Sequence, residues 1–218
     1  MSGAIERISD LLDLGGPVVA LLAGLSVLAL AVVLYKLWQF SAARVGTHAR
    51  LQAALDAWDA GDRGGARARL AESRSHLAPL AHLALDGGRD TAIRERLEAE
   101  AAMSFARLER GFRVLDNIGQ IAPLLGLFGT VLGMIDAFRA LQAAGSAVDP
   151  SVLAGGIWVA LLTTAAGLAV AMPTTLALSW LESRVTRERD FADLLLARAA
   201  APRAPARADA GGADHVPA

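Results

Sequence analysis

The sequence predicts an all-α membrane protein with three transmembrane helices, the second and third of which extend into a helical cytoplasmic region. Three observations lead to this prediction. The 218 residues are 54% hydrophobic and only 20% charged, which is more apolar than a typical soluble domain. The chain contains three apolar stretches of the roughly 20 residues that a helix needs to cross a bilayer. In two of these stretches small residues recur at every third or fourth position, which places them on one helix face.

Composition divides the chain into successive segments, and its basic residues assign each segment a side of the membrane. Of the 21 Lys and Arg residues, 19 lie in residues 36–116 and 182–218, and an excess of basic residues marks cytoplasmic loops. The expected segments are a periplasmic amphipathic N-terminal segment (1–14), the first transmembrane helix (15–38), a cytoplasmic helical region (39–116), the second transmembrane helix (117–141), a periplasmic turn (142–150), the third transmembrane helix (151–181), a cytoplasmic helix (182–199) and a disordered tail (200–218).

The apolar stretch of the first span runs from Pro17 to Tyr35 and is uncharged. The missing N–H of Pro17 is harmless in the first turn of a helix. The span ends in an interfacial belt of Tyr35, Lys36 and Trp38. In such a belt the Lys36 side chain is expected to reach outward to the interface.

The polar region between the first two spans is expected to consist of helical pieces separated at glycines. Thr91 to Leu115 reads as one long helix that runs directly into the second span, since it lacks proline and only Gly111 weakens it. The separating glycines are Gly61, Gly64, Gly65, Gly87 and Gly88. Two apolar sets have helical spacing: Leu51, Leu55 and Trp58, and Leu70, Leu77 and Leu80.

The second and third spans form an antiparallel hairpin in this interpretation, and each carries a stripe of small residues. Gly129 and Gly133 make a GxxxG pair. Helices in lipid associate through close backbone packing rather than through a hydrophobic drive. The stripe is therefore expected to press on a neighbouring helix, so that Gly133→Leu should break an oligomer. The candidate helix-packing residues are Gly126, Gly129, Gly133, Gly156 and Gly167.

Thr130, Thr163 and Thr164 lie at roughly equal depth in the two spans. Two interpretations stay open for them. Each hydroxyl can return a hydrogen bond to a carbonyl of its own helix, or the hydroxyls line a narrow polar path for ions.

Three further residues in the spans are candidates for function. Pro123 and Pro173 each remove a helix hydrogen bond, which makes each either a tolerated bend or a hinge. Asp136 is the only acidic residue in any span, and intramembrane carboxylates are functional candidates. With Arg139 three residues further on, a surface ion pair is the favoured account of Asp136.

Several classes of function are excluded. The chain has no cysteine, so disulfides and thiol chemistry are absent. His76 and His82 lack the spacing of a helical metal pair, and no nucleophile–base set or phosphate loop is present. The sequence therefore predicts no enzyme, no metal and no cofactor. The net charge of −1 argues against nucleic-acid binding.

Residues 122–138 (APLLGLFGTVLGMIDAF) and 156–173 (GIWVALLTTAAGLAVAMP), with the opening 13–40, resemble the MotA/TolQ/ExbB proton channel family. The size is similar to the three-span ExbB and TolQ branch. The resemblance implies an inner-membrane subunit that uses the proton-motive force. It also implies a homopentamer around a single-span ExbD-like or TolR-like partner, which supplies an aspartate, and a TonB-like or TolA-like protein that receives the motion.

The resemblance also assigns roles to residues. The family's pore threonines fall on Thr130 and Thr164, while a glutamate common in the third span is replaced by Val159. This departure keeps a second interpretation open, a non-conducting scaffold that positions partner helices. The sequence also leaves open whether the complex serves nutrient uptake or envelope integrity.

Overall fold

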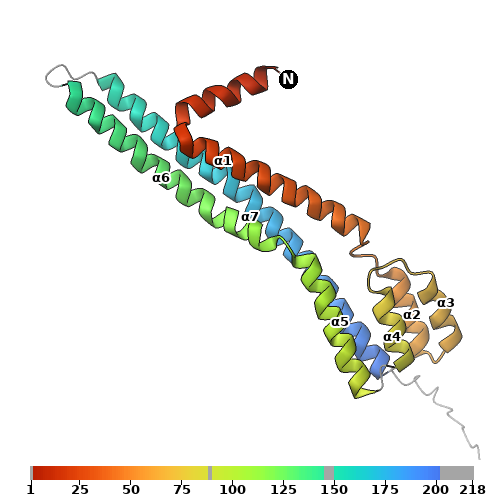
Figure 1. Ribbon diagram of the computed structural model, residues 1–218. Helices are drawn as coiled ribbons and strands as arrows, with labels where there is room; N and C mark the ends of the chain where they lie inside the picture. Colours follow the sequence, from red (N-terminus) through yellow and green to blue (C-terminus); the bar gives the residue numbers. More distant parts are fainter. Residues whose placement is uncertain (1, 88–89, 145–149, 202–218) are drawn as a thin grey trace, which may run out of the picture. The chain divides into compact units, whose positions relative to one another are not determined.

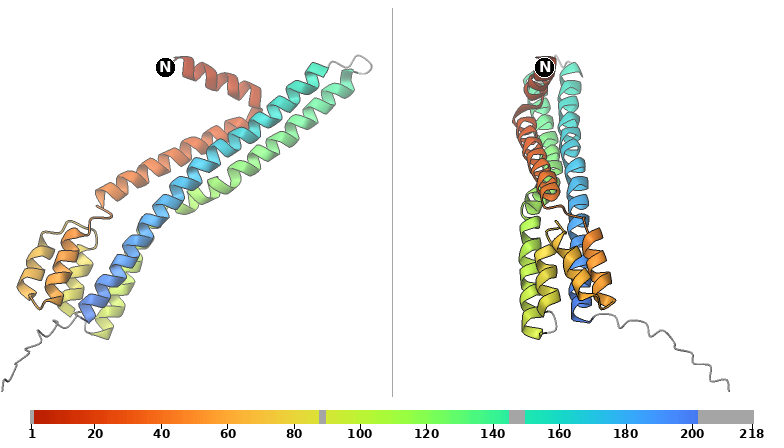
Figure 2. Two further views of the ribbon diagram at one scale, coloured as in Figure 1. Left: turned by 180° about the vertical axis from the view of Figure 1, so that it is seen from behind. Right: turned by 90° about the vertical axis from the view of Figure 1, so that its right-hand side faces the viewer.

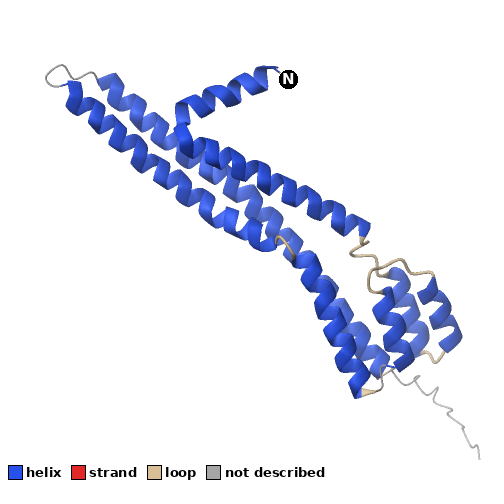
Figure 3. Cartoon of the chain, in the orientation of Figure 1, coloured by secondary structure: helices blue, strands red, loops and turns tan. Residues whose placement is uncertain are grey.

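The computed structural model describes residues 2–87, 90–144 and 150–201, and in these residues the regular elements are all helices, joined by loops and turns (Figure 1, Figure 3). Three stretches are long and apolar enough to cross a membrane: Gly16–Ala42, Phe112–Ala143 and Pro150–Ala200. The prediction of an all-α membrane protein with three spans is thus confirmed for the described residues. The helices are α1 (Ser2–Ala42), α2 (Ala49–Asp59), α3 (Arg63–Ala71), α4 (Ala78–Gly87), α5 (Thr91–Glu109), α6 (Phe112–Ala144) and α7 (Pro150–Ala200).

Some predicted features lie outside the described residues. They are most of the turn expected at 142–150, the tail beyond residue 201, and Gly88. The chain divides into two units. Unit 1 is Met1–Gln39 with Glu109–Ser183, and unit 2 is Phe40–Leu108 with Arg184–Ala218.

In unit 1, α6 and the first part of α7 run side by side, and α1 lies along them (Figure 2). Val18 and Leu22 of α1 pack with Ala122 and Ala171 in one buried cluster. Before this contact α1 breaks at Gly16, whose φ of 61° and ψ of −160° belong to a region that only glycine enters readily. The transmembrane part of α1 therefore starts at the Gly16–Pro17 step.

The belt expected at the end of the first span is only partly seen. Tyr35 and Trp38 are exposed, but Lys36 is 1% exposed, so the expectation that it reaches outward is wrong. Its Nζ donates to Gln39 Oε1 at 2.8 Å and lies 5.5 Å from the ring centroid of Phe112. The first turn of α6 covers Lys36, and this contact cannot be predicted from the sequence of α1 alone.

The expectation of one helix from Thr91 into the second span is also wrong. α5 ends at Glu109 and α6 begins at Phe112, with Gly111 at φ 92° between them. This left-handed conformation ends a helix and suits glycine. The third span, in contrast, continues without interruption through the 51 residues of α7.

Unit 2 contains α2 to α5 up to Leu108 and the last part of α7. Gly61, at φ 84°, separates α2 from α3 as expected. Gly64 and Gly65 instead lie inside α3, because Asp62 caps that helix by accepting a hydrogen bond from the Gly65 N–H at 2.8 Å. The set Leu70, Leu77 and Leu80 is buried but does not share one helix, since the chain breaks between α3 and α4.

Candidate functional site: the small-residue face of the membrane hairpin

The small residues of α6 and α7 face each other within one chain. The helix that the α6 stripe meets is therefore α7 of the same subunit, and a bulky residue at Gly133 acts first on this hairpin. The contacts run along the hairpin as Gly119 with Thr175, Ala122 with Gly167, Gly126 with Thr163 and Gly167, Gly129 with Thr163, Gly133 with Ala160, and Ala137 with Gly156.

At Gly126 and Gly167 the two helices are so close that an added Cβ atom would meet backbone atoms of the facing helix. A Cβ atom on Gly167 would lie 2.6 Å from the carbonyl oxygen of Ala122 and 3.1 Å from Gly126 Cα. A Cβ atom on Gly126 would lie 2.9 Å from the carbonyl oxygen of Thr163. Backbone atoms cannot turn aside as a side chain can, so both positions require glycine at this helix separation.

Thr163 lies against Gly126 and Gly129 and is 2% exposed. Its Oγ1 donates to the carbonyl of Ala160 at 2.7 Å, and the carbonyl of Gly126 lies 3.3 Å away. The single hydroxyl proton is thus directed between a carbonyl of its own helix and one of the facing helix. This geometry fits a residue that joins α7 to α6.

Thr130 and Thr164 differ from Thr163 because both are only partly buried. Thr130 Oγ1 donates to the carbonyl of Leu127 at 2.6 Å, and Thr164 Oγ1 lies 3.4 Å from the Gly126 carbonyl. A hydroxyl oxygen that donates can still accept hydrogen bonds. Thr130 directly follows Gly129, which lies against Thr163. The structure thus places the three candidate threonines at one level of the hairpin.

The candidate carboxylate lies elsewhere. Asp136 is exposed, and its Oδ1 is 3.7 Å from a terminal nitrogen of Arg139, so the pair has the geometry of an exposed ion pair. Val159 is half-buried beside Ala160, which contacts Gly133. The membrane hairpin of this chain therefore carries hydroxyls at its centre and no acidic group there.

Both prolines lie inside continuous helices. Pro123 interrupts the hydrogen-bond ladder of α6, and Pro173 that of α7. Thr174 and Thr175 follow Pro173 and donate to the carbonyls of Val170 and Ala171 at 2.7 and 2.9 Å. These side-chain hydrogen bonds to the helix backbone add interactions next to the backbone hydrogen bond that Pro173 removes. A hinge role for either proline stays a prediction.

Sequence reasoning missed a buried polar cluster in unit 2. Glu188 is 1% exposed; its Oε1 accepts from the Gly46 N–H and lies 3.0 Å from His48 Nε2. His76 Nε2 is 3.6 Å from the other carboxylate oxygen, and His48 stacks on Phe191 with ring centroids 4.1 Å apart. One signal was present, since Glu188 has helical spacing with the buried apolar residues of α7. Within the described residues no group of three acidic or histidine side chains is placed to hold a metal ion.

The cluster makes the stability of unit 2 depend on pH. Burial, with a contribution from His48, lowers the pKa of His76 to about 4. Neutral His76 therefore stabilises the fold above about pH 6.5, and this contribution is lost as the pH falls towards 4. At about 1.4 kcal/mol per pKa unit, the loss reaches at most about 2 kcal/mol at pH 5. Burial raises the pKa of Glu188, which opposes this trend.

A His76→Gln variant removes the titration of His76 and leaves Glu188, His48 and Arg184 in place. It therefore separates the contribution of His76 to the pH dependence from the contributions of these neighbours. We expect the amides of α4 to exchange hydrogen faster in the wild type at pH 5 than at pH 7, after correction for intrinsic rates. The variant should show a weaker pH dependence. Equal pH dependence in both proteins would mean that His76 does not titrate with unfolding.

The fold and this face define a class: multi-pass α-helical membrane proteins in which two long spans pack backbone to backbone around hydroxyl side chains. The profile of the MotA/TolQ/ExbB proton channel family matches residues 67–193, more than half of the chain. The chain therefore belongs to the MotA/TolQ/ExbB proton channel family, and the resemblance seen in the sequence is confirmed.

Individual relatives agree with this assignment. The chain is 36% identical over 192 residues to an ExbB-like biopolymer transport protein of Synechocystis, covering 85% of this chain and 74% of that protein. It is 36% identical over 140 residues to an ExbB homologue of Methanothermobacter thermautotrophicus, covering 62% and 49% of the two chains. It is 54% identical over 63 residues to biopolymer transport protein exbB1 of Vibrio cholerae, covering 29% and 28%.

Proposed function

We propose that this chain is a proton-channel subunit of an inner-membrane energising complex that couples the proton-motive force to work at the cell envelope. The observation that supports this function best is that Thr130, Thr163 and Thr164 lie at one depth of the hairpin, which we call the hydroxyl level. Thr163 is buried there, while Thr130 and Thr164 are only partly buried residues inside otherwise apolar spans. A helix pair that only needed to pack would have no use for three hydroxyl side chains in the middle of its spans.

The proposed complex follows the family pattern. Several copies of the chain, expected to be five, surround the transmembrane helix of an ExbD-like or TolR-like protein. The partner supplies the aspartate that takes up and releases the proton, because the spans of this chain offer no acidic residue except the exposed Asp136. A TonB-like or TolA-like protein receives the resulting motion.

Proton flux into liposomes tests the proposal. The chain and its single-span partner are reconstituted together, and internal pH is followed with a dye after a potential is imposed. We expect flux only when both proteins are present, with the partner alone and protein-free liposomes as controls. A well-formed complex that carries no flux would instead support the non-conducting scaffold, the alternative that Val159 favours.

The proposed orientation has residues 39–116 in the cytoplasm and residues 142–150 in the periplasm. The chain lacks cysteine, so one introduced thiol reports one site. Ala60 and Ala143 are exposed and suit a labelling experiment, whereas the side chain of Ser75 is buried and would be a poor site. An impermeant thiol reagent added to intact spheroplasts should label Ala143→Cys and spare Ala60→Cys, and it should label both after lysis. Labelling of Ala60→Cys before lysis would reverse the topology.

A further inference from the structure

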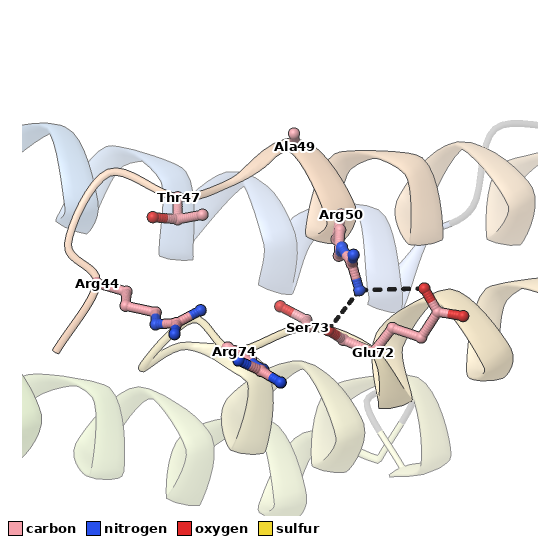
Figure 4. Close-up of a pocket in the computed structure, with 7 residues that line it drawn as sticks. All are labelled: Arg44, Thr47, Ala49, Arg50, Glu72, Ser73 and Arg74. Atoms are coloured by element: carbon pink, nitrogen blue, oxygen red, sulfur yellow. Dashed lines mark hydrogen bonds and ion pairs between the residues drawn. The ribbon is translucent and has the colours of Figure 1, made fainter. Parts of the chain in front are cut away.

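A hollow of about 420 Å³ in unit 2 is lined by basic and hydroxyl side chains (Figure 4). Its walls come from the segment after α1, the start of α2, and the segment between α3 and α4. These segments meet because they are consecutive parts of one small helical unit. The lining residues are Arg44, Thr47, Ala49, Arg50, Glu72, Ser73 and Arg74.

The charge of this hollow is not balanced. Arg50 donates to the backbone carbonyl of Glu72 at 2.9 Å and to its carboxylate at 3.1 Å, which neutralises one arginine. Among the described residues, Arg44 and Arg74 have no hydrogen-bond or ion-pair acceptor. Both side chains are among those that line the hollow (Figure 4). Two guanidinium groups therefore remain free to bind an anion, which they hold best through paired N–H···O bonds.

Hydroxyl groups add neutral donors to the hollow. Ser73 Oγ accepts from the Ser75 N–H at 3.4 Å, and its own proton stays available. Thr47 lies on the facing wall (Figure 4), and its hydroxyl has no partner among the described residues. Guanidinium and hydroxyl donors around one space match the oxygen-rich surface of a phosphate.

The backbone that carries Arg44 is unusual. Arg44 has φ 50°, the only positive φ at a non-glycine residue in the described chain. Such a conformation is disfavoured for a side chain of this size and persists where its surroundings impose it. The loop is held on both sides of Arg44, by Arg44 N–H to Ser41 and by Gly46 N–H to the buried carboxylate of Glu188. The backbone that carries the Arg44 guanidinium is therefore held in place by hydrogen bonds.

We propose that this hollow is a binding site for a phosphate-bearing anion, held by Arg44 and Arg74 with help from Thr47 and Ser73. Two sources share this chemistry: the headgroup of an anionic phospholipid and a soluble phosphate. A lipid headgroup is a candidate because Arg44 lies only six positions along the chain after Trp38, which is exposed at the end of the first span. The soluble anion needs no such proximity.

The test compares three full-length proteins in a non-ionic detergent. They are the wild type, the pocket variant Arg44→Asn with Arg74→Gln, and a control with Arg67→Gln and Arg94→Gln. Asparagine tolerates positive φ, so the first change removes charge without adding backbone strain. Arg67 and Arg94 are exposed residues of the same unit outside the hollow, each paired with a carboxylate. Both variants lose the same charge, and circular dichroism checks that both fold.

Two arms separate the sources. Native mass spectrometry measures retention of phosphatidylglycerol against phosphatidylcholine in mixed micelles, and calorimetry measures inorganic phosphate against chloride at constant ionic strength. We expect the wild type to prefer phosphatidylglycerol or to bind phosphate, and the pocket variant to bind at least about tenfold more weakly. The control should change less than about threefold. No preference in either arm, or an equal loss in the control, would overturn the site.

Discussion

A single methyl group at position 167 is expected to push the two membrane helices apart. In Gly167→Ala the new Cβ would lie 2.6 Å from the Ala122 carbonyl oxygen and 3.3 Å from the Gly126 nitrogen. Neither atom can move without moving α6, and overpacking of this kind costs about 1–3 kcal/mol. We expect a lower thermal midpoint of the detergent-solubilised protein, and a larger drop for Gly167→Val.

Gly155→Ala is the matched control on the same helix. A Cβ there meets nothing within 4 Å, and alanine favours a helix by about 1 kcal/mol over glycine. The control should therefore keep or raise the thermal midpoint. If both variants behaved alike, helix propensity rather than helix approach would govern the hairpin.

A reciprocal exchange sharpens this result. Gly156→Ala would place a Cβ 2.4 Å from the Cβ of Ala137, so alone it should destabilise the hairpin. Adding Ala137→Gly removes the opposing methyl group and leaves one alanine and one glycine on the pair. The double variant should recover most of the lost stability, because the propensity changes cancel. Additive losses would show that this pair does not set the spacing.

Loss of the Thr130 hydroxyl or of the Thr164 hydroxyl should strongly lower proton flux and leave the complex assembled. Valine has nearly the shape of threonine but neither donates nor accepts a hydrogen bond. In the proposed function, Thr130 and Thr164 hydrogen-bond water or the partner's aspartate in both of its protonation states. We expect Thr130→Val and Thr164→Val each to lower flux in liposomes at least about tenfold, with subunit stoichiometry unchanged in native mass spectrometry.

Two further threonines serve as controls. Thr175 donates to the carbonyl of Ala171 at 2.9 Å on its own helix and lies outside the hydroxyl level, so Thr175→Val should keep its flux. Thr163 is buried against the Gly126 carbonyl, and Thr163→Val should lower hairpin stability by about 0.6–1.7 kcal/mol. Wild-type flux in both Thr130→Val and Thr164→Val would remove the hydroxyls from the pathway.

The features that sequence predicts well here are local and periodic. Three spans follow from the length of apolar runs, and the inner face of the hairpin follows from the spacing of Gly126, Gly129 and Gly133. The threonines that share a level also follow, because the two spans are joined by a short turn. These are properties of single helices or of adjacent helices, so the chain order already contains them.

The features that sequence missed depend on contacts between distant segments. Lys36 is buried because Phe112, far along the chain, covers it. The Glu188 cluster joins His48 to a residue 140 positions later in the chain. Gly111 could equally sit within a helix or end one, and only its φ of 92° decides. A glutamate three residues after the buried Val185 was the one local sign of the cluster.

The hairpin places its smallest residues inside and its largest outside, and this arrangement constrains how related chains can diverge. Leu124, Leu161 and Leu176 are 63%, 62% and 72% exposed, while Ala122 and Ala160 are almost fully covered. Lipid accepts any large apolar side chain. The exposed positions such as Leu124, Leu161 and Leu176, here called the outer column, can therefore exchange among Leu, Phe, Ile and Val. The inner column can exchange only among the residues of least volume. Aligned by side-chain volume, homologous chains should therefore keep the inner column nearly constant, while the outer column should diversify faster.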